Sequence, residues 1–371
     1  MPKQVIVQPF LETVEIIDTP IPTPQDKDVV IKDWPHNSGD DIAGIVHSVG
    51  KDVYEFKPGD RVAGLHAFLT ENGSFAEYSV SPDWTTFHLP HNVSFEEAAT
   101  IPVSALTAAL ALYANMKLPA PYDSMEPAQS DEKKVPILIY GVTSAVGAFA
   151  AKYARLSGLS PIIGVAGRAT GYAETLVDYV VDYRNGEDAI VAAVEDVLAN
   201  EGLGSKVPYV FDAISENGSL ETTLRIIEPN GGTVSTVLPP VLFARDKENF
   251  KYPPGVKSST SACPFVHTTH KDFGYIWSRY LSRLLEDGRL KPHPYEVIPG
   301  GLDGVLTGLQ KLRDGKASAV KYVYRIEETK TSPIAEVSSV QATGSQPSEG
   351  QTRQNTHPLR NFPFPLSATD E

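Results

Sequence analysis

Short apolar runs separated by Gly, Pro and Asp turns fill the first part of the chain and predict a small β domain. The expected strands are Val5–Val7, Ile42–Val49, Arg61–Gly64 and Phe75–Val80. Strand-like residues near the other end, Ala319–Arg325, are expected to return to this domain.

The pattern changes after Pro119–Pro136, where proline and charged residues indicate an exposed loop. Beyond it, apolar strands alternate with amphipathic helices such as Gly147–Leu156 and Ala189–Leu198. The expected strands are Ile137–Tyr140, Pro161–Ala166, Tyr179–Asp182, Tyr209–Ile214 and Gly232–Leu238. This alternation predicts an α/β fold with a doubly wound parallel sheet.

One further segment, Lys271–Glu286, has helical periodicity. Its apolar side chains recur every three or four residues and define one buried stripe. They are Phe273, Ile276, Trp277, Tyr280, Leu281, Leu284 and Leu285. Such a stripe is more often core than a ligand-binding surface.

The bulk properties narrow the classes of function. A chain of 371 residues is expected to form two domains. A formal net charge of −14 and a pI near 5.1 argue against a nucleic-acid or anionic-membrane partner, because either would repel the average surface. The single cysteine, Cys263, excludes an internal disulfide framework and a four-cysteine zinc lobe.

Targeting signals are not expected. Met1–Phe10 lacks the pattern of a signal or transit peptide, and no fully apolar run long enough to span a membrane occurs. We therefore expect a cytoplasmic protein without a membrane anchor. The segment from Thr331 to Glu371 is rich in Ser, Thr, Gln and Pro and is predicted to be a disordered tail.

The strand Ile137–Tyr140 leads into a turn of small residues and then a helix, which is typical of a dinucleotide site. Small side chains let the backbone approach a pyrophosphate, and the helix N-terminus favours its charge. The candidate residues are Gly141, Thr143, Ser144, Ala145, Val146 and Gly147. Ser144 stands where glycine is commonest, so a turn that serves packing alone is the alternative.

The next strand ends at Gly167-Arg168, where a dinucleotide site contacts the adenosine ribose. An acidic residue there accepts from a 2′-hydroxyl, whereas arginine accommodates a 2′-phosphate. Arg168 therefore favours NADPH over NADH, and a merely solvated arginine is the alternative. Tyr183 lies either beside the same phosphate or adenine, or simply at the surface.

Three motifs occur in order in the first part of the chain: Gly50-Lys51-Asp52-Val53, then Phe56–Val62, then Gly73–Tyr78. Together they resemble the medium-chain dehydrogenase/reductase superfamily, whose catalytic domain is a GroES-like β barrel. Further segments are similar to the zinc-independent quinone oxidoreductase-like and fungal trans-acting enoyl reductase branch. These are Asn37–Gly44, Ser94–Ala109, Gly300–Val305 and Gly315–Lys321. The resemblance ends near residue 327.

The resemblance implies a domain division: a GroES-like catalytic domain at 1–115 completed by 295–327, a Rossmann NADP-binding domain at 116–294, and a disordered tail at 328–371. It also implies hydride transfer to a quinone or an α,β-unsaturated carbonyl by positioning, with no catalytic side chain singled out. Ala213, Ile214, Val237 and Leu238 are expected beside the nicotinamide, and Ser318 and Ala319 where the cleft closes.

No metal site is expected. His36, His47, His66, His88 and His91 are scattered without ligand spacing, and no cysteine precedes Cys263. A zinc alcohol dehydrogenase is therefore a distant alternative.

The chain departs from the family pattern between Val30 and Asn37. Part of the substrate-side loop of the family is absent there, and Lys32-Asp33-Trp34 resembles the remnant of its turn. Lys32 is then a candidate for a cofactor phosphate. A shortened loop would displace a barrel strand or expose the nicotinamide, unless it reflects a misread exon boundary.

Two functions follow from this. The first is an active NADPH-dependent reductase with a small-molecule substrate, a carrier-bound polyketide being the more specific case. The second is a non-catalytic NADPH-binding protein with a defective active site. Monomer and homodimer both remain open.

Overall fold

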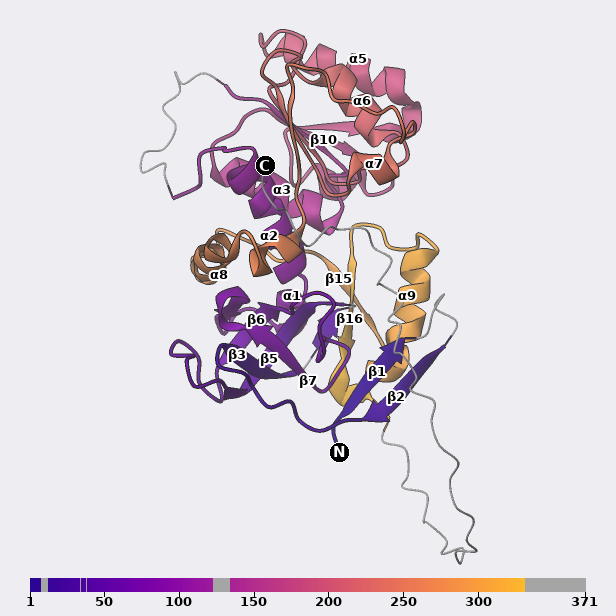
Figure 1. Cartoon of the computed structure of the whole chain (residues 1–371). Coiled ribbons are helices and arrows are strands. Elements are labelled where there is room, and N and C mark those ends of the chain that lie inside the picture. The colour runs from indigo at the N-terminus through magenta and orange to yellow at the C-terminus, as the bar shows by residue number, and fades with distance from the viewer. Residues whose placement is uncertain (8–12, 34, 38, 123–133, 331–371) are drawn as a thin grey trace, which may run out of the picture.

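The computed structural model describes residues 1–7, 13–33, 35–37, 39–122 and 134–330, without the side chains of 33 and 35–37. The predicted tail, apart from residues 328–330, and the centre of the predicted Pro119–Pro136 loop lie outside these residues. Two bodies are stacked, with helices α2 (Pro102–Ala109) and α8 (Lys271–Glu286) between them (Figure 1).

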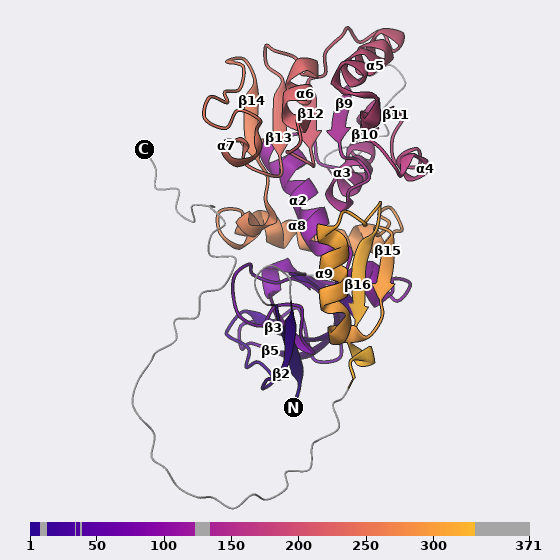
Figure 2. The ribbon, with the colours of Figure 1, turned by 90° about the vertical axis from the view of Figure 1, so that its right-hand side faces the viewer.

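One body is a six-stranded, wholly parallel sheet in the order β11-β10-β9-β12-β13-β14 (Figure 2). Its strands are β9 (Ile137–Tyr140), β10 (Ile162–Ala166), β11 (Tyr179–Asp182), β12 (Tyr209–Asp212), β13 (Thr233–Thr236) and β14 (Lys257–Thr260). The predicted doubly wound sheet is confirmed. Because the chain reverses direction across the sheet between β9 and β12, the ligand crevice is expected outside the carboxyl ends of these strands.

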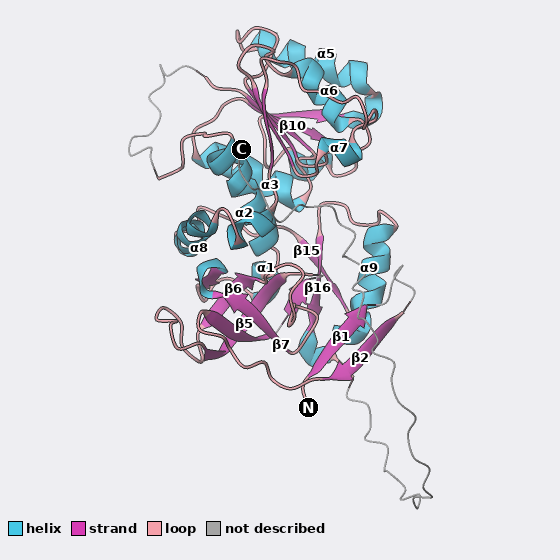
Figure 3. Cartoon of the chain, in the orientation of Figure 1, coloured by secondary structure: helices cyan, strands magenta, loops and turns pink. Residues whose placement is uncertain are grey.

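Helices cover both faces of this sheet (Figure 3). They are α3 (Ala145–Leu156), α4 (Thr170–Ala173), α5 (Glu187–Asn200), α6 (Ser219–Ile226) and α7 (Pro240–Phe243). The inner strands β9, β10 and β12 have no exposed residue. Such strands read as continuous apolar runs, and this is why they could be placed from the sequence. The edge strand β14 is polar and partly exposed, and it was missed.

The second body contains a five-stranded antiparallel sheet in the order β7-β3-β5-β6-β8, and β15 pairs with β16 in parallel beside it. Its strands are β3 (Asp28–Asp33), β5 (Asp41–Val49), β6 (Arg61–Leu65), β7 (Tyr78–Pro82) and β8 (Thr86–His88). A three-stranded sheet joins β15 (Tyr295–Ile298), β16 (Lys321–Arg325) and β4 (Pro35–Asn37), and β1 (Lys3–Val7) pairs with β2 (Val14–Asp18). Helix α9 (Val305–Arg313) packs on β15.

One predicted strand is misplaced. Phe75–Val80 was expected as a unit, but β7 begins only at Tyr78. The chain before it pairs elsewhere: the Val5 amide donates to the Phe75 carbonyl oxygen at 2.8 Å, and Ala76 forms a bridge with Gln4. The extended segment is therefore shared between two sheets.

Strand β3, which leads into the connection between Val30 and Asn37, is paired on both sides. It pairs with β5 on one side and β7 on the other, and only one irregularity, between Val30 and Ile31, interrupts the β3–β5 register. The chain then enters β4, which pairs with β16. The absence of part of the family's loop stays a prediction.

Helix α8 spans the predicted residues, and Trp277, Leu281, Leu284 and Leu285 on it are buried as expected. Ile276, also placed in the buried stripe, is 55% exposed. The buried face of the helix is narrower than its apolar stripe, so Ile276 lies outside the packed face.

The stretch Phe95–Asn115 joins the two bodies. It contains α1 (Phe95–Ala98), α2 and a π-helical turn at Leu110–Asn115. Among the described residues it has the length and mean hydropathy of a membrane span, but 83% of its apolar window is buried inside the fold. It packs on α3 as a core helix.

Candidate active site

The turn after β9 has the geometry of a phosphate-binding loop. Gly141 has φ +75°, and a Cβ there would lie 2.5 Å from the Ile214 side chain. Ser144 caps α3, its hydroxyl accepting from the Gly147 amide at 3.0 Å. A Cβ on Gly147 would lie 2.3 Å from the Gly141 carbonyl oxygen, so only glycine permits this contact between strand and helix.

The residues between these glycines remain accessible. Thr143, Ser144, Ala145 and Val146 are all partly exposed. They surround the N-terminus of the twelve-residue helix α3. Its dipole and free amide groups can bind an anion there.

The end of β10 brings Gly167, Arg168 and Tyr183 together. A Cβ on Gly167 would lie 2.4 Å from the Tyr183 ring, so the ring packs directly on the glycine. Tyr183 begins the short helix η4 (Tyr183–Asn185) and is 47% exposed. Arg168 donates to the Gly315 carbonyl oxygen at 2.9 Å, and in the described part of the chain it forms no ion pair. A guanidinium that is not paired with a carboxylate can still donate hydrogen bonds to a phosphate.

The contact between Arg168 and Gly315 was not predicted from the sequence. Gly315 lies in the loop after α9, on the same loop as Ser318 and Ala319. Ala319 holds a left-handed conformation, with φ +54°. The Arg168 bond therefore brings the loop that contains Ser318 and Ala319 to the end of β10.

A buried carboxylate organises the loop after β12. Asp212 accepts from the amides of Ile214 at 3.0 Å and Ser215 at 2.8 Å, and from the Ser219 hydroxyl at 2.7 Å. Burial is the main cause that raises the pKa of Asp212, and these hydrogen bonds oppose it. The Val237 amide donates to the Ser215 hydroxyl at 2.9 Å. Ala213, Ile214 and Val237 are thus held at adjacent strand ends, with partly exposed Leu238 following Val237.

Sequence reasoning included Asp212 only within the range Phe211–Ile214 and missed its anchoring role, and it missed Ser215 altogether. Their only signal was an aspartate that ends an apolar strand and is followed by small residues. Ser215 has φ +61° and Asn217 has φ +55°, unusual values for residues other than glycine. The Asp212 hydrogen bonds hold this strained loop.

Two adjacent aspartates, Asp40 and Asp41, lie at the start of β5 in the second body. Asp41 forms a buried ion pair with Lys321 on β16, Oδ2 to Nζ 2.6 Å, and accepts the Val103 amide of α2 through Oδ1 at 2.6 Å. Burial, together with the Asp41 charge, raises the pKa of Asp40 to about 7. Cys263, buried at the start of η5 (Cys263–His267), has its pKa raised by burial, with smaller contributions from these aspartates.

Lys32 is the predicted cofactor residue that the structure does not bring to the others. It lies in β3 opposite Ile45 and Tyr78, and no described contact joins it to the residues at the sheet edge. Its role stays a prediction. Within the described residues no group of three His, Cys, Asp or Glu side chains has the arrangement of a metal site.

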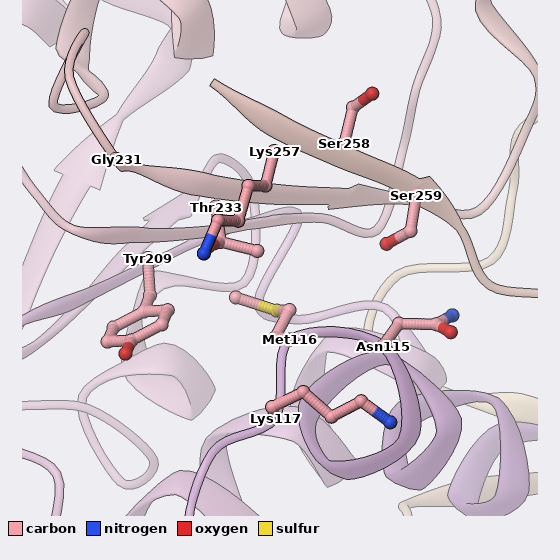
Figure 4. Close-up of a pocket in the computed structure, with 9 residues that line it drawn as sticks. All are labelled: Asn115, Met116, Lys117, Tyr209, Gly231, Thr233, Lys257, Ser258 and Ser259. Atoms are coloured by element: carbon pink, nitrogen blue, oxygen red, sulfur yellow. The ribbon is translucent and has the colours of Figure 1, made fainter. Parts of the chain in front are cut away.

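A pocket of about 260 Å³ lies at the opposite edge of the parallel sheet, where β12, β13 and β14 begin (Figure 4). Tyr209, Thr233 and Lys257 line it together with Met116 and Lys117. It is separated from the residues described above by the length of the strands, so it does not belong to the candidate active site.

Comparison with known proteins agrees with this arrangement. The sequence pattern of the alcohol dehydrogenase GroES-like domain matches residues 2–91. The structure superposes on the CurK enoyl reductase with a TM-score of 0.71 at 18% identity, over 87% of this chain and 99% of that one. A quinone oxidoreductase from Coxiella burnetii gives a TM-score of 0.64 at 18% identity, over 87% of this chain and 99% of that one. The fold is that of the medium-chain dehydrogenase/reductase class.

Proteins related in sequence narrow the family further. Trans-enoyl reductase fsr4 of Gibberella fujikuroi is 38% identical over 315 residues, 78% of this chain and 89% of the relative. Trans-enoyl reductase resD of Aspergillus sclerotiorum is 32% identical over 352 residues, 83% of this chain and 96% of the relative. The chain belongs to the fungal trans-enoyl reductase family of the medium-chain dehydrogenase/reductase superfamily, and this kinship supports oxidoreductase activity.

Proposed function

We propose that this chain is an NADPH-dependent, zinc-independent reductase that saturates the C=C bond of an enoyl thioester. The observation that carries the proposal is the carboxyl edge of the parallel sheet, where the Gly141–Gly147 turn, Arg168 and the Gly315 loop meet. Kinship with trans-enoyl reductases supports the substrate class, of which a carrier-bound polyketide is the specific case. Quinones are the alternative acceptors.

The residues present fit a dinucleotide that carries a 2′-phosphate. The α3 N-terminus and Ser144 suit the pyrophosphate, because small residues leave the backbone amides accessible. Arg168 suits the 2′-phosphate, since no carboxylate competes for it in the described residues. Asp182, which ends the neighbouring strand β11, is paired with Arg184, and this pairing lowers the pKa of Asp182 to about 2.

Bound NADPH supplies the hydride, and the chain supplies position. Ala213, Ile214, Val237 and Leu238 flank the nicotinamide on strand ends fixed by Asp212 and Ser215. Ser318 and Ala319 close the cleft from the barrel side and exclude water. Rigid placement of the two reactants accounts for much of the rate gain in such chemistry.

A non-catalytic NADPH-binding protein is the second candidate. The shortened connection between β3 and β5 favours it, because the family's substrate-side loop is incomplete there. In that case the cofactor site works while the acceptor is held poorly.

One experiment tests both. The purified chain is titrated with NADPH and NADH by fluorescence, and then mixed with NADPH and an enoyl pantetheine thioester while NADPH absorbance is followed. Selective NADPH binding with turnover supports the reductase, and binding without turnover for enoyl thioesters and quinones supports the second candidate. Failure to bind either nucleotide contradicts both, and stoichiometric zinc by metal analysis contradicts zinc independence.

A further inference from the structure

Two neighbouring carboxyl groups, Asp40 and Asp41, enter the junction between the barrel and the parallel sheet in different surroundings. Asp41 is engaged on both oxygens, by Lys321 and by the Val103 amide, each at 2.6 Å. Asp40 is half-buried, yet its carboxyl group makes no hydrogen bond or ion pair with any described residue. An acid left without a partner in a buried setting stands ready for a ligand or for proton transfer.

The position of Asp40 points to the reacting end of the cleft. Its carbonyl oxygen accepts the His66 amide at 2.8 Å, which fixes it beside the end of β6. It lies close enough to Cys263 to influence the thiol electrostatically. Cys263 comes just after β14, where the Ser261 amide donates to the Thr236 carbonyl oxygen at 2.7 Å. Asp40 therefore lies near the segment that follows β14, and this segment is bonded to the end of β13, which leads into Val237 and Leu238.

We propose that Asp40 is the proton donor that completes the reduction; this rests on the proposed function, because it needs an enoyl substrate. Once the β carbon of the substrate has received the hydride from NADPH, the C=C electron pair moves onto the thioester carbonyl as an enolate. The O–H bond of Asp40 then breaks, and its proton forms the new C–H bond at the α carbon. NADP⁺ and a carboxylate remain, and the carboxylate recovers its proton from water.

The surroundings keep Asp40 able to hold that proton. Burial and the Asp41 charge raise the pKa of Asp40 to about 7, so a large share is protonated at neutral pH. The other charged or titratable groups around it are Lys321, whose charge is taken by Asp41, the buried Cys263 thiol, and His66. Burial lowers the pKa of His66, so its ring stays neutral and adds no charge.

The test compares Asp40→Asn with the exposed control Asp196→Asn on α5. For enoyl thioester reduction, Asp40→Asn is expected to lower kcat by roughly 100-fold or more while the Kd for NADPH stays unchanged. Wild-type kcat falls as pH rises through about 7, and this dependence disappears in Asp40→Asn. In D₂O the wild type adds deuterium to one face of the α carbon, whereas Asp40→Asn adds it to both. Quinone reduction persists, since oxygen takes its proton from water.

Other outcomes are equally decisive. An Asp40→Asn variant with wild-type kcat, pH profile and facial selectivity overturns the assignment and leaves the proposed function intact. If Asp40→Asn does not fold, Asp40→Glu and a carbon-13 NMR titration of the wild-type carboxyl take its place, and an ordinary aspartate pKa overturns the proposal. A wild type that binds NADPH but reduces no enoyl thioester overturns the proposed function, and the donor role with it.

Discussion

The parallel-sheet body and the barrel body form their sides of the candidate site in different ways. On the sheet side the geometry is made by backbone: a left-handed Gly141, a serine cap on α3 and amides gathered by Asp212. On the barrel side it is made by charge, through the buried Asp41–Lys321 pair and its neighbour Asp40. The residues that shape the sheet side are close together in the sequence, whereas the charged residues of the barrel side come from distant segments.

If that contrast is right, the largest loss of stability comes from the barrel side. Asp41→Ala strands the Lys321 ammonium in a buried setting and removes the acceptor of the Val103 amide. The free energy of unfolding is expected to fall by about 3–5 kcal/mol, measured by urea denaturation. Replacing both partners, Asp41→Asn with Lys321→Met, should recover part of the loss. A loss below about 1 kcal/mol for Asp41→Ala would show that the pair is not a structural link.

On the sheet side, Gly147→Ala is expected to act through the backbone. The new methyl group would meet the Gly141 carbonyl oxygen, so the start of α3 must shift, at about 1–3 kcal/mol in stability and with weaker NADPH binding. Gly171→Ala, on α4 with open space around it, is the matched control and should be neutral. Equal behaviour of the two variants in thermal unfolding and NADPH titration would contradict the tight turn.

Arg168→Ala sharpens the assignment of the ribose end. NADPH affinity is expected to drop roughly tenfold because a charge-assisted contact to the 2′-phosphate is lost, and NADH affinity should stay the same. Arg155→Ala, whose arginine pairs with Asp178, serves as the control. An equal drop for both nucleotides would mean that Arg168 acts only through Gly315.

The smallest expected effect concerns Lys152 on α3, which donates to the carbonyl oxygens of Lys291 at 2.8 Å and Pro292 at 3.0 Å. Burial lowers the pKa of Lys152 from 10.5 to about 8. Between these values the unfolded chain binds the proton that the folded chain has released, so Lys152 makes stability rise with pH across that window. The urea midpoint of the wild type, relative to that of Lys152→Met, should therefore rise between pH 8 and 10.5. Parallel curves would contradict the shifted pKa.

The elements that could be predicted from the sequence are those whose pattern of apolar and polar residues is complete within a short segment. Five strands of the parallel sheet and the span of α8 were predicted from their apolar patterns, whereas the polar edge strand β14 was not. Phe75–Ala76 was assigned to the wrong strand because the sequence of an extended segment does not show which strand it pairs with. Here it pairs with β1 and not with the neighbours of β7. Ile276 was misplaced because periodicity shows which face is apolar and not how much of it is covered.

The candidate site divides in the same way. The turn from Gly141 to Gly147 and the Gly167-Arg168 end could be proposed from the sequence because each lies within one strand–turn–helix unit. The Asp41–Lys321 pair joins residues 280 positions apart, and no pattern in a single sequence links them. The Arg168–Gly315 contact was missed for the same reason.

Under the proposed function, that last contact would link the two bodies to the choice of nucleotide. A 2′-phosphate that draws the Arg168 guanidinium away from the Gly315 carbonyl oxygen would loosen the loop before Ser318, at a cost in binding free energy. A nucleotide with a free 2′-hydroxyl would leave that hydrogen bond intact. Nucleotide binding and the freedom of this loop would then be thermodynamically linked, each changing the other by the same factor.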